Sequence, residues 1–184
     1  MSPADPDGLP EVRIRTTGVA GTRAFGAWLA AVARPGDRIA LTGPLGAGKT
    51  QVAKGFAAGL GVREVVNSPS FTLMAEYDGR LPMFHQDLYR LEGIADAFSG
   101  GLLDERQDLG VTLSEWADRL GGAAGDEGLR LRLRMPDDVT TGPPSDEDDA
   151  LGAADEPREI VLSASPGYGR YLDRARAWPG EGVG

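Results

Sequence analysis

The sequence predicts an α/β fold, in which helices are layered on a mixed, partly parallel sheet and an antiparallel hairpin lies near the C-terminus. Strand-like and helical periodicities alternate along the first two thirds of the chain. An apolar strand-like run, a glycine-rich loop and a helical pattern follow one another between residues 38 and 60. Two late strand-like segments, 129–135 and 158–163, have no helical pattern between them and are expected to pair antiparallel.

The N-terminal part alternates strand and helix. Residues 11–15 (EVRIR) alternate in polarity, as a half-buried strand does. Phe25, Trp28 and Leu29 fall on one face of a helical pattern over 19–33. After the turn at Pro35-Gly36-Asp37, a buried strand is expected over 38–41 and a helix over 49–60.

The later elements are shorter. Asp78-Gly79 is typical of a tight hairpin turn between two strands. Gly121-Gly122 ends a helical stretch that starts at Trp116. The strands expected here are 71–77, 81–85 and 111–114, and the helices are 94–103, 116–120 and 168–178.

Length and composition predict a single domain over residues 1–184, in which the 136–157 segment is a disordered acidic insertion. That segment holds eight acidic residues and no basic ones, so it accounts for most of the chain's net charge of −9. A chain without a dense basic stripe is a poor candidate for binding nucleic acid alone. The absence of cysteine, of a long apolar run and of a leader-like N-terminus leads us to expect a cytoplasmic protein away from membranes.

The segment Gly43 to Thr50 matches the phosphate-loop pattern G-x-x-x-x-G-K-S/T. Gly46 and Gly48 permit backbone angles that turn successive N–H groups inward, and the following helix points its positive end at the same place. Lys49 would neutralise β- and γ-phosphate oxygens, and the Thr50 hydroxyl would ligate Mg²⁺. The sequence therefore predicts a P-loop NTPase-like three-layer sandwich that binds ATP with Mg²⁺.

A phosphate loop needs an acid at the end of a neighbouring strand to help hold Mg²⁺. Glu115 and Asp87 each follow a predicted strand and are the candidates. Glu115 could instead be an acid at a helix N-terminus, and Asp87 an N-cap or a partner of Arg90. His85 and Trp116 fit core positions as well as positions at the phosphates or the base.

Several segments together resemble one family, the bacterial TsaE-type P-loop ATPases needed for threonylcarbamoyladenosine formation in tRNA. The resemblance runs in order from about Thr16 to Trp116, and is weaker over the last two strands. The matching segments are Thr22 to Gly26, Gly43 to Gln51, Ser68 to Leu73, His85 to Leu91 and Ser114 to Trp116. Pro44, Gln51, Ser70 and Gln86 depart from the family pattern, which has aspartate, threonine, threonine and an aromatic residue there.

The resemblance implies a weak ATPase that works with TsaD-type and TsaB-type proteins, which form threonylcarbamoyladenosine at position 37 of tRNAs decoding ANN codons. tRNA would be met only indirectly. By similarity, Asp87, Glu115 and Lys49 are catalytic, Thr50 and Glu115 hold Mg²⁺, and Ser68 to Leu73 act as a nucleotide-sensing switch. The residues implied in nucleotide binding are Thr22, Leu45, Gly46, Ala47, Gly48, Lys49, Thr50, Gln51 and Arg158.

Two alternatives are considered beside a complex-dependent ATPase. A small P-loop kinase acting on a metabolite would need an arginine-bearing lid, but the arginines after the switch stretch, Arg90 and Arg106, are few and scattered. An assembly protein that binds ATP as a switch without useful turnover would use the same residues as a slow ATPase.

Overall fold

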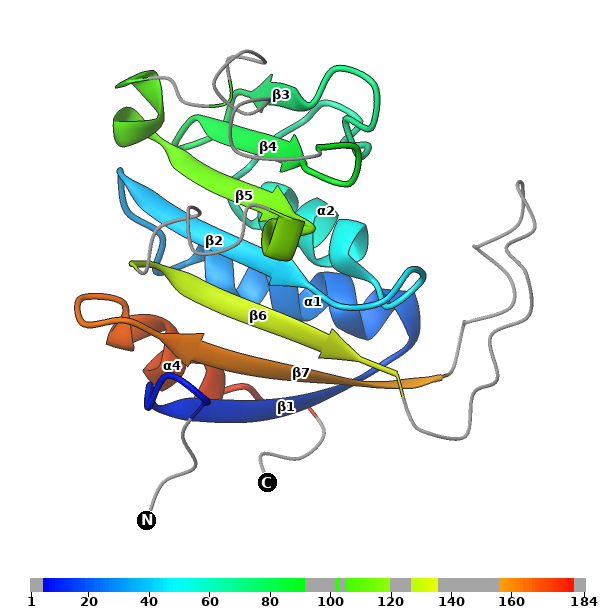
Figure 1. Cartoon of the computed structure of the whole chain (residues 1–184), viewed down its shortest axis with the longest axis vertical. Coiled ribbons are helices and arrows are strands. Elements are labelled where there is room, and N and C mark those ends of the chain that lie inside the picture. The colour runs from blue at the N-terminus through cyan, green and yellow to red at the C-terminus, as the bar shows by residue number, and fades with distance from the viewer. Residues whose placement is uncertain (1–4, 92–101, 103–104, 120–126, 136–155, 181–184) are drawn as a thin grey trace.

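The computed structural model describes residues 5–91, 102, 105–119, 127–135 and 156–180. They form a mixed α/β fold built on one seven-stranded sheet with the order β1-β7-β6-β2-β5-β4-β3 (Figure 1). The strands are β1 (Glu11–Thr17), β2 (Asp37–Thr42), β3 (Met74–Tyr77), β4 (Met83–Asp87), β5 (Val111–Glu115), β6 (Leu129–Arg134) and β7 (Pro157–Ala164).

The centre of the sheet is parallel and its flanks are antiparallel. β2 pairs parallel with β5 and β6, and β4 pairs parallel with β5. β7 runs antiparallel to both β6 and β1, and β3 runs antiparallel to β4. The predicted mixed, partly parallel sheet is therefore present. Its parallel strands bring the carboxyl ends of β2, β4 and β5 to the same edge, where ligands bind in open α/β sheets.

Three helices cover one face of this sheet: α1 (Gly18–Ala30), α2 (Lys49–Gly59) and α4 (Gly169–Arg176) (Figure 1). Their buried side chains join alternate strand residues such as Ile14, Leu41 and Leu113 in one apolar core. Against the opposite face, the described residues include the short 3₁₀ helix η1 (Glu105–Leu109), whose Arg106 lies over the Phe84 ring and whose Gln107 donates to the Leu102 carbonyl, as Gln86 does. The described part of the chain thus contains one full helical layer, whereas the predicted sandwich has two.

α1 and α2 pack with their backbones in close contact, because glycines line the contact. A Cβ added at Gly55 would lie 2.0 Å from the Arg23 carbonyl oxygen, and one at Gly26 would lie 2.4 Å from that of Val52. A Cβ at Gly59 would likewise lie 2.6 Å from the Ala27 carbonyl oxygen. No side chain fits at these positions without moving one helix away from the other.

Most predicted elements are confirmed within a few residues, and three predictions change. β3 begins at Met74 rather than at residue 71, because Leu73 adopts a left-handed φ of 64° that a strand excludes. β5 is followed by a turn at Trp116, with φ 58°, and a 3₁₀ turn rather than by an α-helix from Trp116. Pro157, predicted to lie in the acidic insertion, is the first residue of β7 and pairs with Thr17.

Some predictions fall on other parts of the chain. The helix predicted over 94–103 and the acidic insertion up to residue 155 lie outside the described residues, apart from Leu102. In the described residues, no helix has the length and apolarity needed to cross a membrane.

Candidate functional site

The loop from Gly43 to Gly48 joins β2 to α2 and has left-handed backbone angles at each of its three glycines. Their φ values are 134°, 79° and 102° at Gly43, Gly46 and Gly48. A Cβ at Gly43 would lie 2.4 Å from the Leu133 carbonyl oxygen, so neighbouring β6 also requires glycine there. The loop delivers the chain into the first turn of α2, whose unpaired N–H groups point back toward it.

Lys49, the first residue of α2, folds back over the loop. Its Nζ donates to the carbonyl oxygens of Gly43 and Pro44, at 2.8 Å each, and lies 3.6 Å from the centre of the Trp116 ring. An ammonium has three N–H donors, so these two bonds leave one, on the side of the ring. Burial lowers the pKa of Lys49, and nearby acids, Glu115 foremost, oppose that shift.

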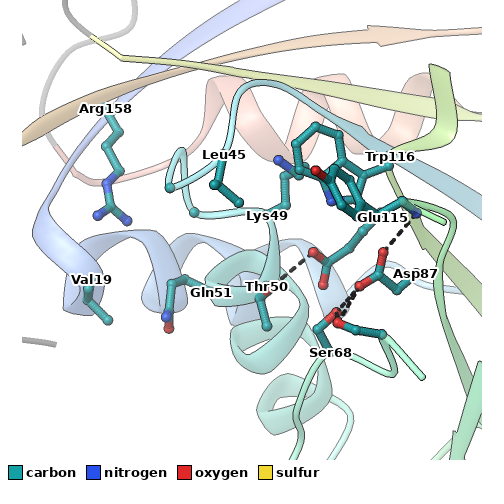
Figure 2. A pocket seen from close by; sticks show the side chains of 14 residues that line it. Val19, Leu45, Lys49, Thr50, Gln51, Ser68, Asp87, Glu115, Trp116 and Arg158 are labelled. Atoms are coloured by element: carbon teal, nitrogen blue, oxygen red, sulfur yellow. Dashed lines mark hydrogen bonds between the residues drawn. The ribbon is translucent and has the colours of Figure 1, made fainter. Parts of the chain in front are cut away.

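Thr50, in the first turn of α2, and Glu115, the last residue of β5, contact each other. The Thr50 hydroxyl donates to Glu115 Oε2 at 2.9 Å (Figure 2). The other carboxylate oxygen, Oε1, lies 2.8 Å from His85 Nε2. Glu115 is buried, with 2% of its surface exposed. A buried carboxylate with both oxygens directed by hydrogen bonds has a defined orientation.

Asp87 lies at the end of β4, opposite Glu115 in the register of β4 and β5. Its Oδ2 accepts hydrogen bonds from the hydroxyls of Ser68 and Ser70, at 2.5 and 2.8 Å, and its Oδ1 accepts one from the Tyr89 backbone N–H. Asp87 therefore ties the Ser68–Leu73 stretch to the same edge of the sheet. The left-handed Leu73 stands at the end of that stretch, where its carbonyl accepts the Asp87 N–H.

Arg158 reaches the loop from the other side, from β7. Figure 2 shows it at one end of the pocket, while Trp116, Glu115 and Asp87 lie at the other end. Its Nη1 lies 2.7 Å from the place that a Cβ on Gly48 would take, and has no hydrogen-bond partner among the described residues. The residue is 4% exposed, and burial lowers the pKa of its guanidinium, with Glu156 opposing.

Most of the predicted site residues come together around one pocket. Its lining includes nine of them: Leu45, Gly46, Gly48, Lys49, Thr50, Gln51, Asp87, Glu115 and Arg158. The other two, Ala47 and Thr22, are fully buried and are not among the lining residues. The Thr22 hydroxyl bonds to Thr16 Oγ1 and to the Gly18 carbonyl, and its methyl lies beneath Gly48.

The same pocket has lining residues that were not in the predicted set: Val19, Ser68, Ser70, Tyr89 and Trp116. Ser68 and Ser70 belong to the stretch that the resemblance marked as a switch, so a signal for them existed. Tyr89 and Trp116 contact each other, with ring centres 4.9 Å apart. Trp116 also fitted a core position in sequence, and only the left-handed turn after Glu115 directs its ring to the pocket.

This arrangement can bind an anion at the loop, next to the oxygens of Thr50, Asp87 and Glu115. Two cations, an α-helix N-terminus and glycine N–H groups surround the loop, and the Thr50 hydroxyl and two carboxylates lie at its edge. This combination of donors suits a phosphate chain, and the carboxylate and hydroxyl oxygens suit a hard divalent cation.

Comparison with known proteins gives a consistent family. The model of the family "Threonylcarbamoyl adenosine biosynthesis protein TsaE" matches residues 16–141. The tRNA threonylcarbamoyladenosine biosynthesis protein TsaE of Bacillus subtilis is 40% identical over 157 residues, covering 85% of this chain and 87% of that protein. Its namesake from Streptomyces coelicolor is 37% identical over 129 residues, covering 68% and 84%.

A solved structure is similar as well. The crystal structure of Bacillus subtilis YdiB superposes with a TM-score of 0.65 at 33% sequence identity, covering 91% of this chain and 95% of that one. The similarity in sequence and the similarity in fold both extend over most of the chain.

Proposed function

The chain belongs to the TsaE family, and from that premise we propose that it is a Mg²⁺-dependent ATP-binding protein and weak ATPase. TsaE proteins take part in tRNA threonylcarbamoyladenosine biosynthesis. In this proposal the chain supports the complex that forms threonylcarbamoyladenosine at position 37 of tRNAs decoding ANN codons. TsaD-type and TsaB-type proteins are its partners, and it meets tRNA only through them.

The observation that carries the ATP and Mg²⁺ part is the contact between Thr50 Oγ1 and Glu115 Oε2, at 2.9 Å. Mg²⁺ binds oxygens at about 2.1 Å in octahedral geometry, which places neighbouring ligands about 3.0 Å apart. Both oxygens therefore already have the spacing that two adjacent ligands of one Mg²⁺ need. Bound there, Mg²⁺ would neutralise charge on the phosphates of ATP.

The residues around the loop divide the remaining work. The glycine N–H groups and the N-terminus of α2 would cradle the phosphates, and the Lys49 ammonium would reach them on leaving the face of the Trp116 ring. Arg158, whose Nη1 is buried and unpartnered in the described residues, would meet the nucleotide from the β7 side. Each of these groups carries positive charge or a free donor toward the same pocket, which favours a polyphosphate ligand.

Weak hydrolysis fits the surroundings of Asp87. Its carboxylate is the candidate for orienting the attacking water, as acids and amides do in other phosphoryl-transfer sites. Here both carboxylate oxygens already accept hydrogen bonds, from Ser68, Ser70 and the Tyr89 N–H. We infer that faster turnover requires the Ser68–Leu73 stretch to release Asp87, and that partner proteins promote this release.

Replacing Glu115 tests the Mg²⁺ assignment. Because Glu115→Ala removes a ligand, we expect Mg²⁺-dependent ATP turnover to fall by about 100-fold, while ATP affinity in EDTA changes less than about threefold. Turnover is measured by phosphate release and affinity by calorimetry. Glu76→Ala is the control, because Glu76 is exposed on β3 and pairs with Arg106 away from the pocket. Unchanged turnover in Glu115→Ala would contradict the assignment.

The partners are tested separately. The protein is used as bait for purified TsaD-type and TsaB-type proteins, with ATP, with ADP and without nucleotide. We expect capture that depends on nucleotide, and ATP hydrolysis that is slow alone and faster with the partners. Robust phosphoryl transfer to a small metabolite, with no effect of the partners, would instead favour a kinase.

A further inference from the structure

We propose that His85 is a positioning residue for Glu115: its Nε2–H holds one carboxylate oxygen so that the other faces Thr50, where the two residues would hold Mg²⁺. This inference rests on the proposed function and assigns a role to a buried group that the phosphate-loop chemistry itself does not use. His85 does not line the pocket, so it would act only through Glu115.

The contacts form a chain of three side chains. His85 Nε2 lies 2.8 Å from Glu115 Oε1, and Thr50 Oγ1 lies 2.9 Å from Glu115 Oε2. The His85 side chain is completely buried and that of Glu115 is 3% exposed. Water therefore has little access to Oε1, and the imidazole is the group that satisfies it in the described residues.

The strand register explains why a histidine can stand there. In the parallel pair of β4 and β5, His85 pairs with Leu113 and Asp87 pairs with Glu115. Side chains two apart on a strand share a face, so His85 and Asp87 both point to the helix side, as Leu113 and Glu115 do. β4 thus supplies one group behind Glu115 and one group beside it.

The direction of the hydrogen bond follows from the chemistry of the pair. An ionised carboxylate can only accept, so in this proposal Nε2 carries the proton. Nδ1 has no hydrogen-bond partner among the described residues, so the imidazole ring is oriented by its contact with Glu115. The same contact orients the Glu115 carboxylate. Outer groups that bond to metal ligands in this way commonly change metal affinity about 10–100-fold when removed.

A matched pair of variants tests the role of the N–H. Gln and Met have similar length, but only Gln keeps a donor near the Nε2 position, so His85→Gln is compared with His85→Met. The quantity measured is the ratio of the ADP dissociation constants in EDTA and in excess Mg²⁺. We expect this ratio to be about tenfold smaller in His85→Met than in the wild type, and to stay within about threefold of the wild-type value in His85→Gln. Both variants should bind ADP normally in EDTA.

Outcomes against the proposal are distinct. A wild-type ratio in His85→Met, or an equal loss in His85→Gln and His85→Met, overturns the positioning role. Glu115→Gln is measured in parallel. If Glu115→Gln keeps the full Mg²⁺ effect, the Mg²⁺ assignment falls, and the positioning role falls with it; if only Glu115→Gln loses it, the positioning role alone falls.

A second measurement needs no substitution at a buried site. His85 is the single histidine in the chain, so its ring signals in the ¹⁵N-histidine-labelled wild-type protein are unambiguous. Long-range ¹H–¹⁵N spectra should find Nε2 protonated, and Mg²⁺ with ADP should shift that signal more than ADP in EDTA does. An unprotonated Nε2 would overturn the proposal, because that nitrogen could not donate to Glu115.

Discussion

Arg170 on α4 and Arg158 on β7 are both largely withdrawn from solvent, but the fold surrounds them differently. Arg170 forms an ion pair with Asp37 and donates to the carbonyls of Val32 and Gly167, and Tyr171 donates to the same Asp37 carboxylate. Burial acts to lower the pKa of Arg170, but the hydrogen bond and charge of Asp37 outweigh it, and the pKa is raised.

Arg158 has none of this support in the described residues. Its Nη1 is buried without a hydrogen-bond partner, and its pKa is lowered by burial with only Glu156 opposing. A buried cation without a partner costs folding free energy, whereas a paired one holds elements together. Asp37, Arg170 and Tyr171 thus satisfy one another's charge and hydrogen bonds, and we call them the α4 cluster. Arg158, in contrast, leaves its positive charge available to an anion in the pocket.

The largest effect on stability should come from removing Asp37 from the α4 cluster. Asp37→Ala leaves the Arg170 guanidinium and the Tyr171 hydroxyl without their acceptor, so we expect the free energy of unfolding to fall by about 3 kcal/mol. Urea denaturation measures this, and ADP affinity of the folded protein should stay within about twofold. Asp173→Ala is the control, because its exposed i,i+3 pair with Arg176 should be worth less than about 0.5 kcal/mol. Equal effects of the two variants would contradict the comparison.

In the pocket we expect the opposite result, of intermediate size: a loss of ADP affinity without a loss of stability. Arg158→Met removes a buried, unpartnered charge, so the free energy of unfolding should stay the same or rise, while ADP affinity should fall about 30-fold, or about 2 kcal/mol. Calorimetry and urea denaturation on the same samples measure both. Arg134→Met, at an exposed position on β6, should change neither. A loss of stability without a loss of affinity would place Arg158 with Arg170 as a structural residue.

The smallest effect distinguishes the tryptophans of the two regions. Trp28 lies under Arg174 at the α4 cluster, whereas the Trp116 ring covers the Lys49 ammonium, a contact worth about 1 kcal/mol. ADP binding should disturb the Trp116 contact and change tryptophan emission. The change should persist in Trp28→Phe and disappear in Trp116→Phe. If it disappears in Trp28→Phe instead, nucleotide binding reaches the α4 cluster and the two regions are not independent.

How far the sequence predicts this molecule depends on how local each feature is. The loop after β2 and the start of α2 are predicted almost to the residue, because Gly43, Gly48, Lys49 and Thr50 act within one short segment. Glu115 and Asp87 could be proposed as strand-end acids, since Glu115 directly follows the predicted strand 111–114 and Asp87 comes two residues after the predicted strand 81–85.

The rest depends on contacts between distant segments. The pairing of His85 with Glu115 requires the parallel register of β4 and β5, and the sequence carries no mark of that register. The interaction of Asp37 with Tyr171 joins residues 134 positions apart, and Asp37 alone looked like a turn residue. Trp116 has a left-handed conformation unusual for a bulky side chain, so no local preference predicts where its ring points.

The glycine-lined contact between α1 and α2 also has a consequence for how substitutions act at a distance. Gly55 lies more than one helical turn from Lys49 and Thr50 and does not line the pocket, but a Cβ there would collide with the Arg23 carbonyl. Since α2 is a rigid rod, pushing it off α1 would tilt or shift its first turn as well. A single methyl group at this contact between α1 and α2 would thus misalign the side chains of Lys49 and Thr50. Natural substitutions at Gly55 are therefore expected to alter the pocket, although Gly55 does not line it.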